Sequence, residues 1–524
     1  MRLKPKVFFG LLEDDSIYFS SAKALAEGHG YVLPSVPGLP AATKYPILYP
    51  WILSWVWRLD ASFPANIKDA AVVNITFGFA FILGAFVFFK GIGRLGDPET
   101  LFLTAFCGLH PIVVIHSANL LTEIPFAALT LWAAVMASKA VSAEGTAHAS
   151  MISGMLSGAA FLTRLVGLPF AAGLYLAILW RKGWRKSLIF AGGALPFLGV
   201  LVWTAVVKPP SHAPPLSVSG CARVWQMNWL YYTSYLSFWK ADAIQGHALW
   251  SMMKQNLMLL SVQPGIYFLN PQVLKPSGPA IIAALLLSVG VWKGLIAHAK
   301  GKLGPIHFAL ALYLIPVILW DYPLVERFLI PFLPFIVLGL WLEVTRLFGL
   351  IKRSMANSAP RDQKPAAVFL AFALVGLMLF TGRSFQLGLK ELIENSKIRG
   401  RMLGEKEEAY GWLRQHMGSE ETVIAYEDAS LFLYTGRQSF RPVILSPAGA
   451  FHAEQRQKEL ECITASAIAL RARYWVISDD DYGMEPGRVE QFVRANKSGG
   501  SFHEVFLSEH HKVSVLEAET ADRR

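Results

Sequence analysis

Apolar segments of membrane-crossing length recur along the first three quarters of this chain of 524 residues. A helix needs about 20 apolar residues to cross the hydrocarbon core of a bilayer. Charged residues make up 16% of the chain, whereas soluble domains carry about 25%. We therefore expect a polytopic α-helical membrane protein with roughly 10 membrane helices, several of them short, over residues 69–89, 100–116, 119–138, 151–163, 165–180, 187–207, 278–298, 305–320, 328–349 and 366–382.

The loops between these segments set an orientation, because Lys and Arg gather in cytoplasmic loops. The run RKGWRK at 181–186 carries four basic residues and no acid, and the loops at 293–302 and 346–364 are also basic. Alternating spans then place Lys90 and Arg94 on the same face. The opposite, extracytoplasmic face receives residues 13–67, the turns near 119–123 and 164, the loop 208–277, the segment 321–327 and residues 384–524. Within 13–67, the aromatic run at 46–57 predicts an interfacial helix.

The chain divides into a membrane domain, residues 1–390, and a small extracytoplasmic α/β domain, residues 391–524. Residues 400–524 carry 15 basic against 20 acidic side chains, whereas the rest of the chain carries 33 against 17. The pattern of the tail predicts strands at 422–426 and 474–478 and two more within 502–517. It also predicts helices near 397–417, 451–472 and 486–497. The net positive charge of the chain does not indicate nucleic-acid binding, since the Lys and Arg residues of the expected cytoplasmic loops explain it.

Three cysteines make neither a disulfide framework nor a metal-ligand spacing. Cys221 and Cys462 would share the extracytoplasmic compartment, but we do not expect them to pair, because disulfide frameworks normally use more cysteines. The first twelve residues lack the apolar length and the small-residue cleavage site of a signal peptide.

Acidic residues gather on the expected outer face. Asp14 and Asp15 open the stretch DDSIYFSSAKALAEG, where they could cap a helix or supply a general base. Glu123 lies at the outer end of a predicted membrane helix, where a charged side chain is costly and often functional.

Basic residues lie on the same expected face. Arg164 could join two helices by hydrogen bonds, and Glu326 with Arg327 could anchor a span at the interface. Lys44 could also anchor the chain at the membrane interface. Two or three carboxylates and three cations on one face would also suit a reaction on a lipid-linked phosphate ester, with an acid–base pair and phosphate-binding cations.

Several motifs resemble one family in their order and spacing. They are DDSIY with ALAEGHGY, then KYPILYP, the TE of LLTEIPF after His110–Pro111, GMLSGAAFLTR and ERFLIPFLP. Together they resemble the GT-C superfamily of membrane glycosyltransferases over nearly the whole chain. More narrowly, they resemble the bacterial branch with protein O-mannosyltransferase-like enzymes and aminoarabinose transferases of lipid A.

The resemblance implies an inverting transfer of a hexosyl or pentosyl group from a polyprenyl-phosphate donor to an acceptor hydroxyl, outside the bacterial cytoplasmic (inner) membrane. It implies that Asp14 is the general base, with Asp15 beside it, and that Glu123 is the acid of the second outer loop. Its implied phosphate-binding cations are Lys44, Arg327 and, with a looser fit, Arg164. The substrate-contact candidates are Tyr18, Tyr45 and Glu326.

Other readings stay open. Intramembrane charges would also suit a transporter, although we find no internal repeat, and an inactive glycan-assembly component would share the same motifs. No cofactor is required, although paired carboxylates could hold Mg²⁺ or Mn²⁺. The acceptor could be a protein, lipid A or another glycan. The family usually places a membrane helix before the acidic motif. We expect that this first span is missing through a late start; the alternative is that the protein lacks it and that its first residues lie on the outer surface.

Overall fold

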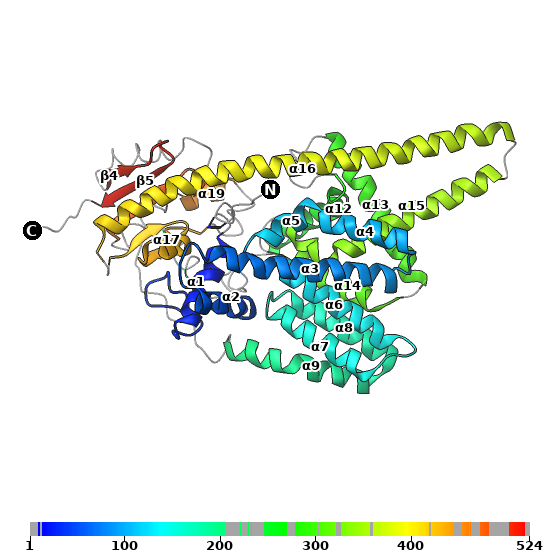
Figure 1. The fold of residues 1–524 in the computed structure, drawn as a ribbon, viewed down its shortest axis with the longest axis horizontal. Helices are drawn as coiled ribbons and strands as arrows, with labels where there is room; N and C mark the ends of the chain where they lie inside the picture. The colour runs from blue at the N-terminus through cyan, green and yellow to red at the C-terminus, as the bar shows by residue number, and fades with distance from the viewer. Residues whose placement is uncertain are drawn as a thin grey trace, which may run out of the picture.

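The fold is taken from a computed structural model, which describes residues 9–10, 13–204, 221, 229, 232, 246–269, 278–301, 303–320, 326–356, 360–418, 421–444, 453–460, 462, 472–481 and 502–518. A bundle of helices forms one part of the molecule and a small sheet forms the other (Figure 1). The helices α1 (Asp14–Ala26) and α2 (Leu48–Leu59) lie between these two parts.

Five helices of the described chain are long and apolar enough to cross a membrane. They are α3 (Ile67–Gly91), α6 (Glu123–Val141), α9 (Trp184–Val202), α13 (Gly278–Gly301) and α15 (Leu333–Ala356), which is preceded by the 3-10 helix η3 (Glu326–Phe332). A sixth candidate span is a pair of helices, α4 (Asp97–Leu109) and α5 (Pro111–Ala118), bent by 52°. The bend falls at Pro111, which cannot donate a backbone hydrogen bond to continue the first helix.

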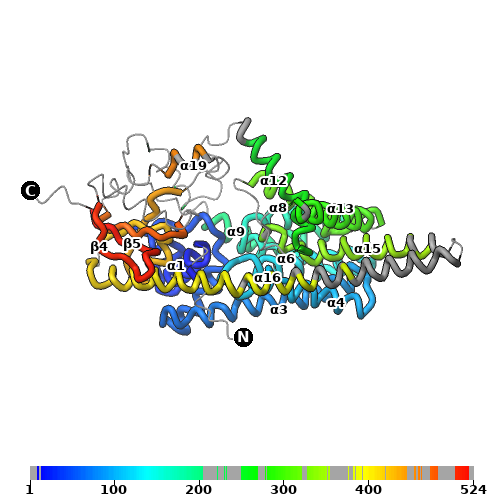
Figure 2. Tube along the Cα trace, turned by 90° about the horizontal axis from the view of Figure 1, so that it is seen from above, coloured from blue at the N-terminus to red at the C-terminus, as the bar shows by residue number. Residues whose placement is uncertain are grey.

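Within the described residues, each predicted apolar segment falls mostly on a helix, but not every helix is long enough to span a membrane. The helices α7 (Ala147–Phe161), α8 (Gly167–Lys182) and α14 (Pro305–Ile318) have 15, 16 and 14 residues. The last predicted span belongs to α16 (Pro360–His416), a single helix of 57 residues that runs the length of the molecule to the sheet (Figure 2). The multi-pass helical architecture is therefore confirmed, while the number of ten spans stays a prediction.

One helix of the bundle was not predicted. α12 (Gly246–Ile266) lies within what the sequence indicated as a long outer loop, and it packs on α13. A side chain at Gly265 would lie 1.9 Å from the Ala284 carbonyl, so a glycine is needed for this close approach. Ser288 joins the same two helices, since its hydroxyl accepts from the Gly265 N–H at 2.8 Å and donates to the Val262 carbonyl at 3.1 Å.

The predicted interfacial segment forms α2, with one buried and one exposed side. Tyr49, Leu53 and Trp57 are buried against α1, whereas Trp51 and Trp55 are about half exposed. This amphipathic pattern suits a helix that lies on a membrane surface, and its placement there stays a prediction.

The C-terminal domain contains a five-stranded sheet of order β2-β1-β3-β5-β4. β1 (Val423–Ala425), β2 (Ser439–Phe440) and β3 (Tyr474–Ser478) are parallel, and β4 (Phe502–Leu507) and β5 (Val513–Ala518) complete it as antiparallel strands. Three helical segments lie beside the sheet: α17 (Asp428–Thr435), α19 (Ala453–Leu460) and the end of α16. The predicted strands are confirmed, β2 was missed, and the helix predicted near 486–497 lies outside the described residues.

Cys221 and Cys462 form a disulfide, with Cα atoms 5.8 Å apart. The expectation that these cysteines stay unpaired was wrong. The error came from counting cysteines, because a single bridge between segments 241 residues apart leaves no spacing pattern in the sequence. A disulfide here fits the expected extracytoplasmic side for both segments, since disulfides persist in oxidising compartments.

Cys462→Ser is expected to lower the free energy of unfolding by about 2–5 kcal/mol, because the bridge closes a long loop in the unfolded chain. Thermal unfolding in detergent would measure the loss, and the variant should no longer respond to a reductant. An unchanged melting temperature, together with free thiols at both positions in the untreated wild-type protein, would contradict the bridge.

Candidate active site

The first turn of α1 holds the acidic pair predicted from the sequence. Asp14 is 19% exposed, and its Oδ1 accepts a hydrogen bond from the Tyr45 hydroxyl at 2.6 Å. The helix begins after Glu13, whose φ of 55° lies in the left-handed region that residues with a Cβ rarely adopt. The aromatic and proline-rich run that follows α1 therefore folds back so that Tyr45 orients the first carboxylate.

Arg327 links this carboxylate to the second outer loop. Its Nη1 lies 3.4 Å from Asp14 Oδ2 and 3.3 Å from Glu123 Oε1. A guanidinium has several N–H donors in one plane, so it can hold two carboxylates at once. Asp14 and Glu123, 109 positions apart in the chain, thus share one cation, which lies in η3 at the entry to α15.

Glu123 is held by a second arginine. Arg164, in the turn between α7 and α8, donates from Nη1 to Glu123 Oε1 at 2.7 Å and to Thr122 Oγ1 at 3.0 Å. Glu123 is 2% exposed and is the first residue of α6, where the helix dipole favours a negative charge. Arg164 therefore acts through Glu123, and this is the interhelical role that the sequence left open for it.

Lys44 lies beside the same cluster and is half-buried. Its ammonium stands 4.9 Å from the centre of the Tyr45 ring. Burial lowers the pKa of Lys44 to about 7, although the nearby Asp14 carboxylate raises it. Lys44 is thus a cation whose charge is sensitive to what binds next to it.

The other predicted site residues have different surroundings. Asp15 is fully buried, and its oxygens accept the N–H groups of Gly10 at 3.0 Å and Ser16 at 2.6 Å. Burial raises the pKa of Asp15 to about 8. These contacts give Asp15 a role in organising the loop, so we now propose Asp14 alone as the base.

Tyr18 is also buried, with its hydroxyl 3.5 Å from Thr122 Oγ1 and its ring edge-on to that of Tyr45. Tyr18 thus contacts Tyr45, which bonds to Asp14, and Thr122, which precedes Glu123. Glu326 begins η3, and its side chain lies outside the part of the structure that is described.

The C-terminal domain adds an ionic contact that sequence reasoning missed. Arg441, which follows β2 and is 2% exposed, donates from Nη1 to Glu13 Oε2 at 2.6 Å and from Nε to Asp428 Oδ1 at 3.1 Å. Burial raises the pKa of Glu13, but the Arg441 guanidinium, a hydrogen bond from Tyr426 and the charge of Lys44 together lower the pKa below its usual value. The domain therefore holds the residue that immediately precedes Asp14.

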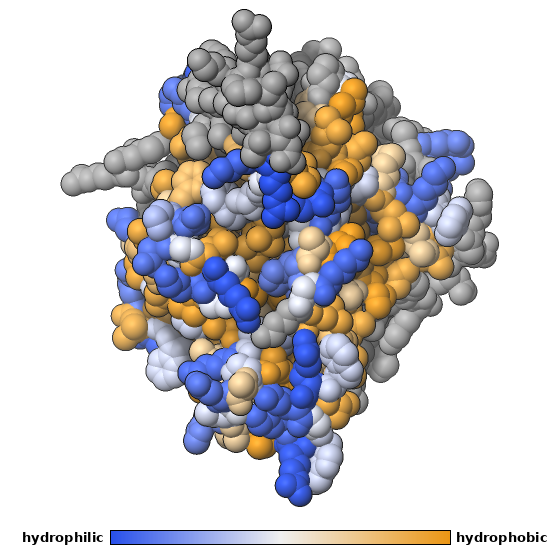
Figure 3. Space-filling view, turned by 90° about the vertical axis from the view of Figure 1, so that its right-hand side faces the viewer, coloured by the Kyte–Doolittle hydropathy of each residue, from blue (hydrophilic) through white to orange (hydrophobic). Residues whose placement is uncertain are grey.

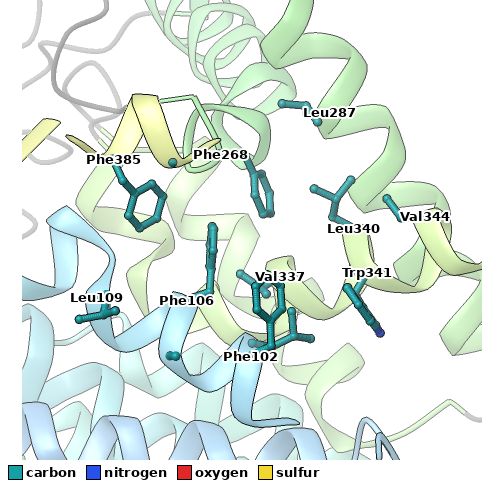
Figure 4. Close-up of a pocket in the computed structure, with 13 residues that line it drawn as sticks. Phe102, Phe106, Leu109, Phe268, Leu287, Val337, Leu340, Trp341, Val344 and Phe385 are labelled. Carbon is teal, nitrogen blue, oxygen red and sulfur yellow. The ribbon is translucent and has the colours of Figure 1, made fainter. Parts of the chain in front are cut away.

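An apolar pocket of about 480 Å³ lies elsewhere in the bundle, between α4, α13, α15 and α16 (Figure 4). Four of its aromatic rings, those of Phe102, Phe106, Phe268 and Phe385, face the cavity, and Trp341 lies at its edge. None of the residues that line it is charged. A pocket of this composition fits a hydrocarbon chain.

The described residues contain no group of three or more His, Cys, Asp or Glu side chains that could hold a metal ion. The Arg327 guanidinium stands between Asp14 and Glu123 and forms ion pairs with both carboxylates. These residues therefore do not fit an ion bridging the two acids, and no step below is routed through one.

No protein-family model and no curated protein matches this chain. Solved structures do match in fold. The chain aligns over 98% of its length with ArnT from Cupriavidus metallidurans bound to undecaprenyl phosphate, covering 96% of that chain at 12% identity with a TM-score of 0.51. It also aligns over 98% of its length with the archaeal oligosaccharyltransferase AglB from Archaeoglobus fulgidus in complex with an inhibitory peptide and a dolichol-phosphate, covering 71% of that chain at 11% identity with a TM-score of 0.52. The expected fold is thereby confirmed: this chain has the fold of the GT-C glycosyltransferases.

Proposed function

We propose that this protein is an inverting glycosyltransferase that moves a sugar from a polyprenyl-phosphate donor to an acceptor hydroxyl. The observation that carries the proposal is the chain of contacts from Tyr45 through Asp14 and Arg327 to Glu123. It puts one partly exposed carboxylate next to cations at the end of a helical bundle. The two compared structures, which carry undecaprenyl phosphate and dolichol-phosphate, support a lipid-linked donor.

The reaction needs one base and no covalent intermediate. The acceptor oxygen attacks the anomeric carbon from the side opposite the phosphate, its proton passes to Asp14, and the bond from the anomeric carbon to the phosphate oxygen breaks. The electron pair of that bond leaves with polyprenyl phosphate. Attack from the opposite side inverts the configuration of the sugar.

The leaving phosphate needs cations, because negative charge develops on its oxygen as the bond breaks. Arg327 is 32% exposed and Lys44 is half-buried, so both can reach a ligand beside Asp14. Glu123 and Arg164 are more deeply buried, and we assign them to holding Arg327 in position. The apolar pocket of Figure 4 would suit part of the donor's hydrocarbon chain.

We place the site on the extracytoplasmic face of the bacterial inner membrane, because the basic loops lie at the opposite ends of the helices. The direct test supplies proteoliposomes with radiolabelled polyprenyl-phosphate sugars and an extract of acceptors. Transfer of label to an acceptor, with inverted anomeric configuration, is the expected result. Uptake of label into the vesicles without transfer would instead identify a transporter.

Lys44→Gln is expected to remove a pH dependence of donor binding. In the wild type, Lys44 is protonated below its pKa of about 7 and loses its charge above it, so KM for the donor should rise as the pH rises. The rise can reach about tenfold per pH unit. In the variant, KM should be high at low pH already and nearly flat from about pH 6 to about pH 8.5.

The matched control is Lys68→Gln, which removes an exposed lysine at the start of α3. It should keep the wild-type profile. A wild-type KM that does not change over this pH range would show that Lys44 does not bind the donor phosphate.

A further inference from the structure

A second pocket, of about 630 Å³, opens at the opposite end of the bundle from Asp14. Ser138 and Ser142 line it at the C-terminal end of α6, whereas Glu123 begins that helix. The 19 residues of α6 separate the two sites by about 28 Å. The pocket therefore does not belong to the proposed active site.

The charged lining of this pocket is entirely basic. Arg94, which follows α3, and Arg181, near the end of α8, both line it, and none of its lining residues is an aspartate or glutamate. Three segments that the sequence assigned to the cytoplasmic face, at Arg94, at Arg181 and at 293–302, contribute lining residues here.

The two arginines are not neutralised by described residues. Arg181 donates from Nη2 to the Leu303 carbonyl at 2.7 Å and lies over the Trp180 ring, but it has no carboxylate partner among them. Arg94 makes no ion pair or hydrogen bond with any part of the chain that the structure describes.

The acids at this end of the bundle do not compensate them. Asp97 is bound to Lys90, and Glu343 is bound to Lys293 and Arg346. Glu99 and Glu144, in the neighbouring segments, do not line the pocket. Two guanidinium groups thus face one cavity without a counter-ion from these residues.

The wall behind the arginines is fixed by two histidines. His307 Nδ1 lies 3.0 Å from the Gly304 nitrogen and 3.2 Å from the Gly304 carbonyl oxygen, and His307 Nε2 lies 3.1 Å from His298 Nδ1. The two rings stack with centres 5.1 Å apart. The histidines thereby join α13 to the start of α14, and a pocket with a fixed wall is preorganised for a ligand.

Arg94 is held in an unusual conformation at this wall. Its φ of 54° lies in the left-handed region, which is unfavourable for a residue with a Cβ. The turn is closed by a bond from the Leu95 N–H to the Phe89 carbonyl at 3.2 Å. Strained residues of this kind cluster at ligand-binding sites.

We propose that this pocket binds the phosphate-bearing headgroup of an anionic phospholipid. Guanidinium groups bind phosphate oxygens through paired hydrogen bonds. Basic pockets between membrane helices on the cytoplasmic side are typical sites for anionic headgroups. Figure 3 looks onto this end of the molecule, where hydrophilic side chains surround exposed apolar ones, as a headgroup and its acyl chains would require.

The first test compares binding of phosphatidylglycerol and phosphatidylcholine to the purified full-length protein in nanodiscs or by native mass spectrometry. The wild type should prefer phosphatidylglycerol by about 25-fold, since each of two basic residues contributes roughly a factor of five. The double variant Arg94→Gln with Arg181→Gln should lose this preference. Arg185→Gln removes a basic residue of the same loop that does not line the pocket, and it should keep the preference.

The second test uses only the wild-type protein, so it does not depend on whether a variant folds. Phosphatidylglycerol with a photoreactive headgroup should cross-link to peptides covering 91–94, 138–142 or 297–307, and unlabelled phosphatidylglycerol should compete. Cross-links confined to other segments would overturn the proposal. Competition by millimolar inorganic phosphate that equals that of the lipid would assign the pocket to a free anion and would also overturn it. Neither readout uses sugar transfer, so each stands apart from the proposed activity.

Discussion

Asp14→Asn is expected to lower kcat for sugar transfer by about 10²–10⁴-fold, the usual contribution of a general base. Asparagine has nearly the same shape, and its carbonyl can still accept the bond from the Tyr45 hydroxyl that Asp14 accepts at 2.6 Å. Arg327 keeps its contact with Glu123 at 3.3 Å. The variant should therefore fold and bind the donor, while the acceptor hydroxyl loses its proton acceptor.

Steady-state kinetics with a polyprenyl-phosphate sugar would separate these effects, with KM for the donor within about threefold of the wild type. Asp69→Asn is the matched control, because it removes an exposed carboxylate in the first turn of α3. Wild-type turnover in Asp14→Asn would remove Asp14 from the mechanism. A large rise in donor KM with normal kcat would instead make it a binding residue.

Much of the fold was predictable because helices and strands depend on local patterns. Apolar length and periodicity located the helices of the bundle, and the aromatic and β-branched run YWVIS predicted β3 at its observed bounds of Tyr474–Ser478. α12 escaped because its residues are less apolar than those of the spans, and β2 because it has only two residues. The pairing of β2 with β1 depends on tertiary contacts that no local pattern records.

The grouping of the candidate site residues was predictable to a similar depth. Asp14, Tyr45, Glu123, Arg164 and Arg327 come from four separate segments of the expected outer face, and the structure joins them through direct hydrogen bonds and ion pairs. Charges at the ends of apolar segments were the signal that found most of them, because a charge at membrane depth needs a partner.

The contact between Glu13 and Arg441 could not be predicted in this way. The two residues are 428 positions apart, and Arg441 follows β2 of the C-terminal sheet, where an arginine needs no special explanation. The same holds for its second partner, Asp428, which is 1% exposed. Pairings of this kind follow from how distant segments pack together, which no local sequence pattern specifies.

Glu123→Ala is expected to cost about 3–5 kcal/mol of stability, because removing one partner of a buried ion pair leaves its cation without compensation. Arg164 is 13% exposed, so it cannot recover full hydration after the loss of its 2.7 Å bond to Glu123. Arg327 would lose the contact at 3.3 Å that holds it beside Asp14. We therefore expect sugar transfer to fall by roughly 100-fold in the folded fraction, as for a misplaced catalytic group.

Glu343→Ala is a matched control within the same chain. Glu343 is 5% exposed and also pairs with two cations, Lys293 and Arg346, but these are 55% and 49% exposed. Because water can solvate them after the substitution, the loss of stability should be much smaller than for Glu123→Ala. Unfolding of both variants in the same detergent would measure the difference. Equal losses would mean that the burial of Arg164 does not set the stability cost of removing Glu123.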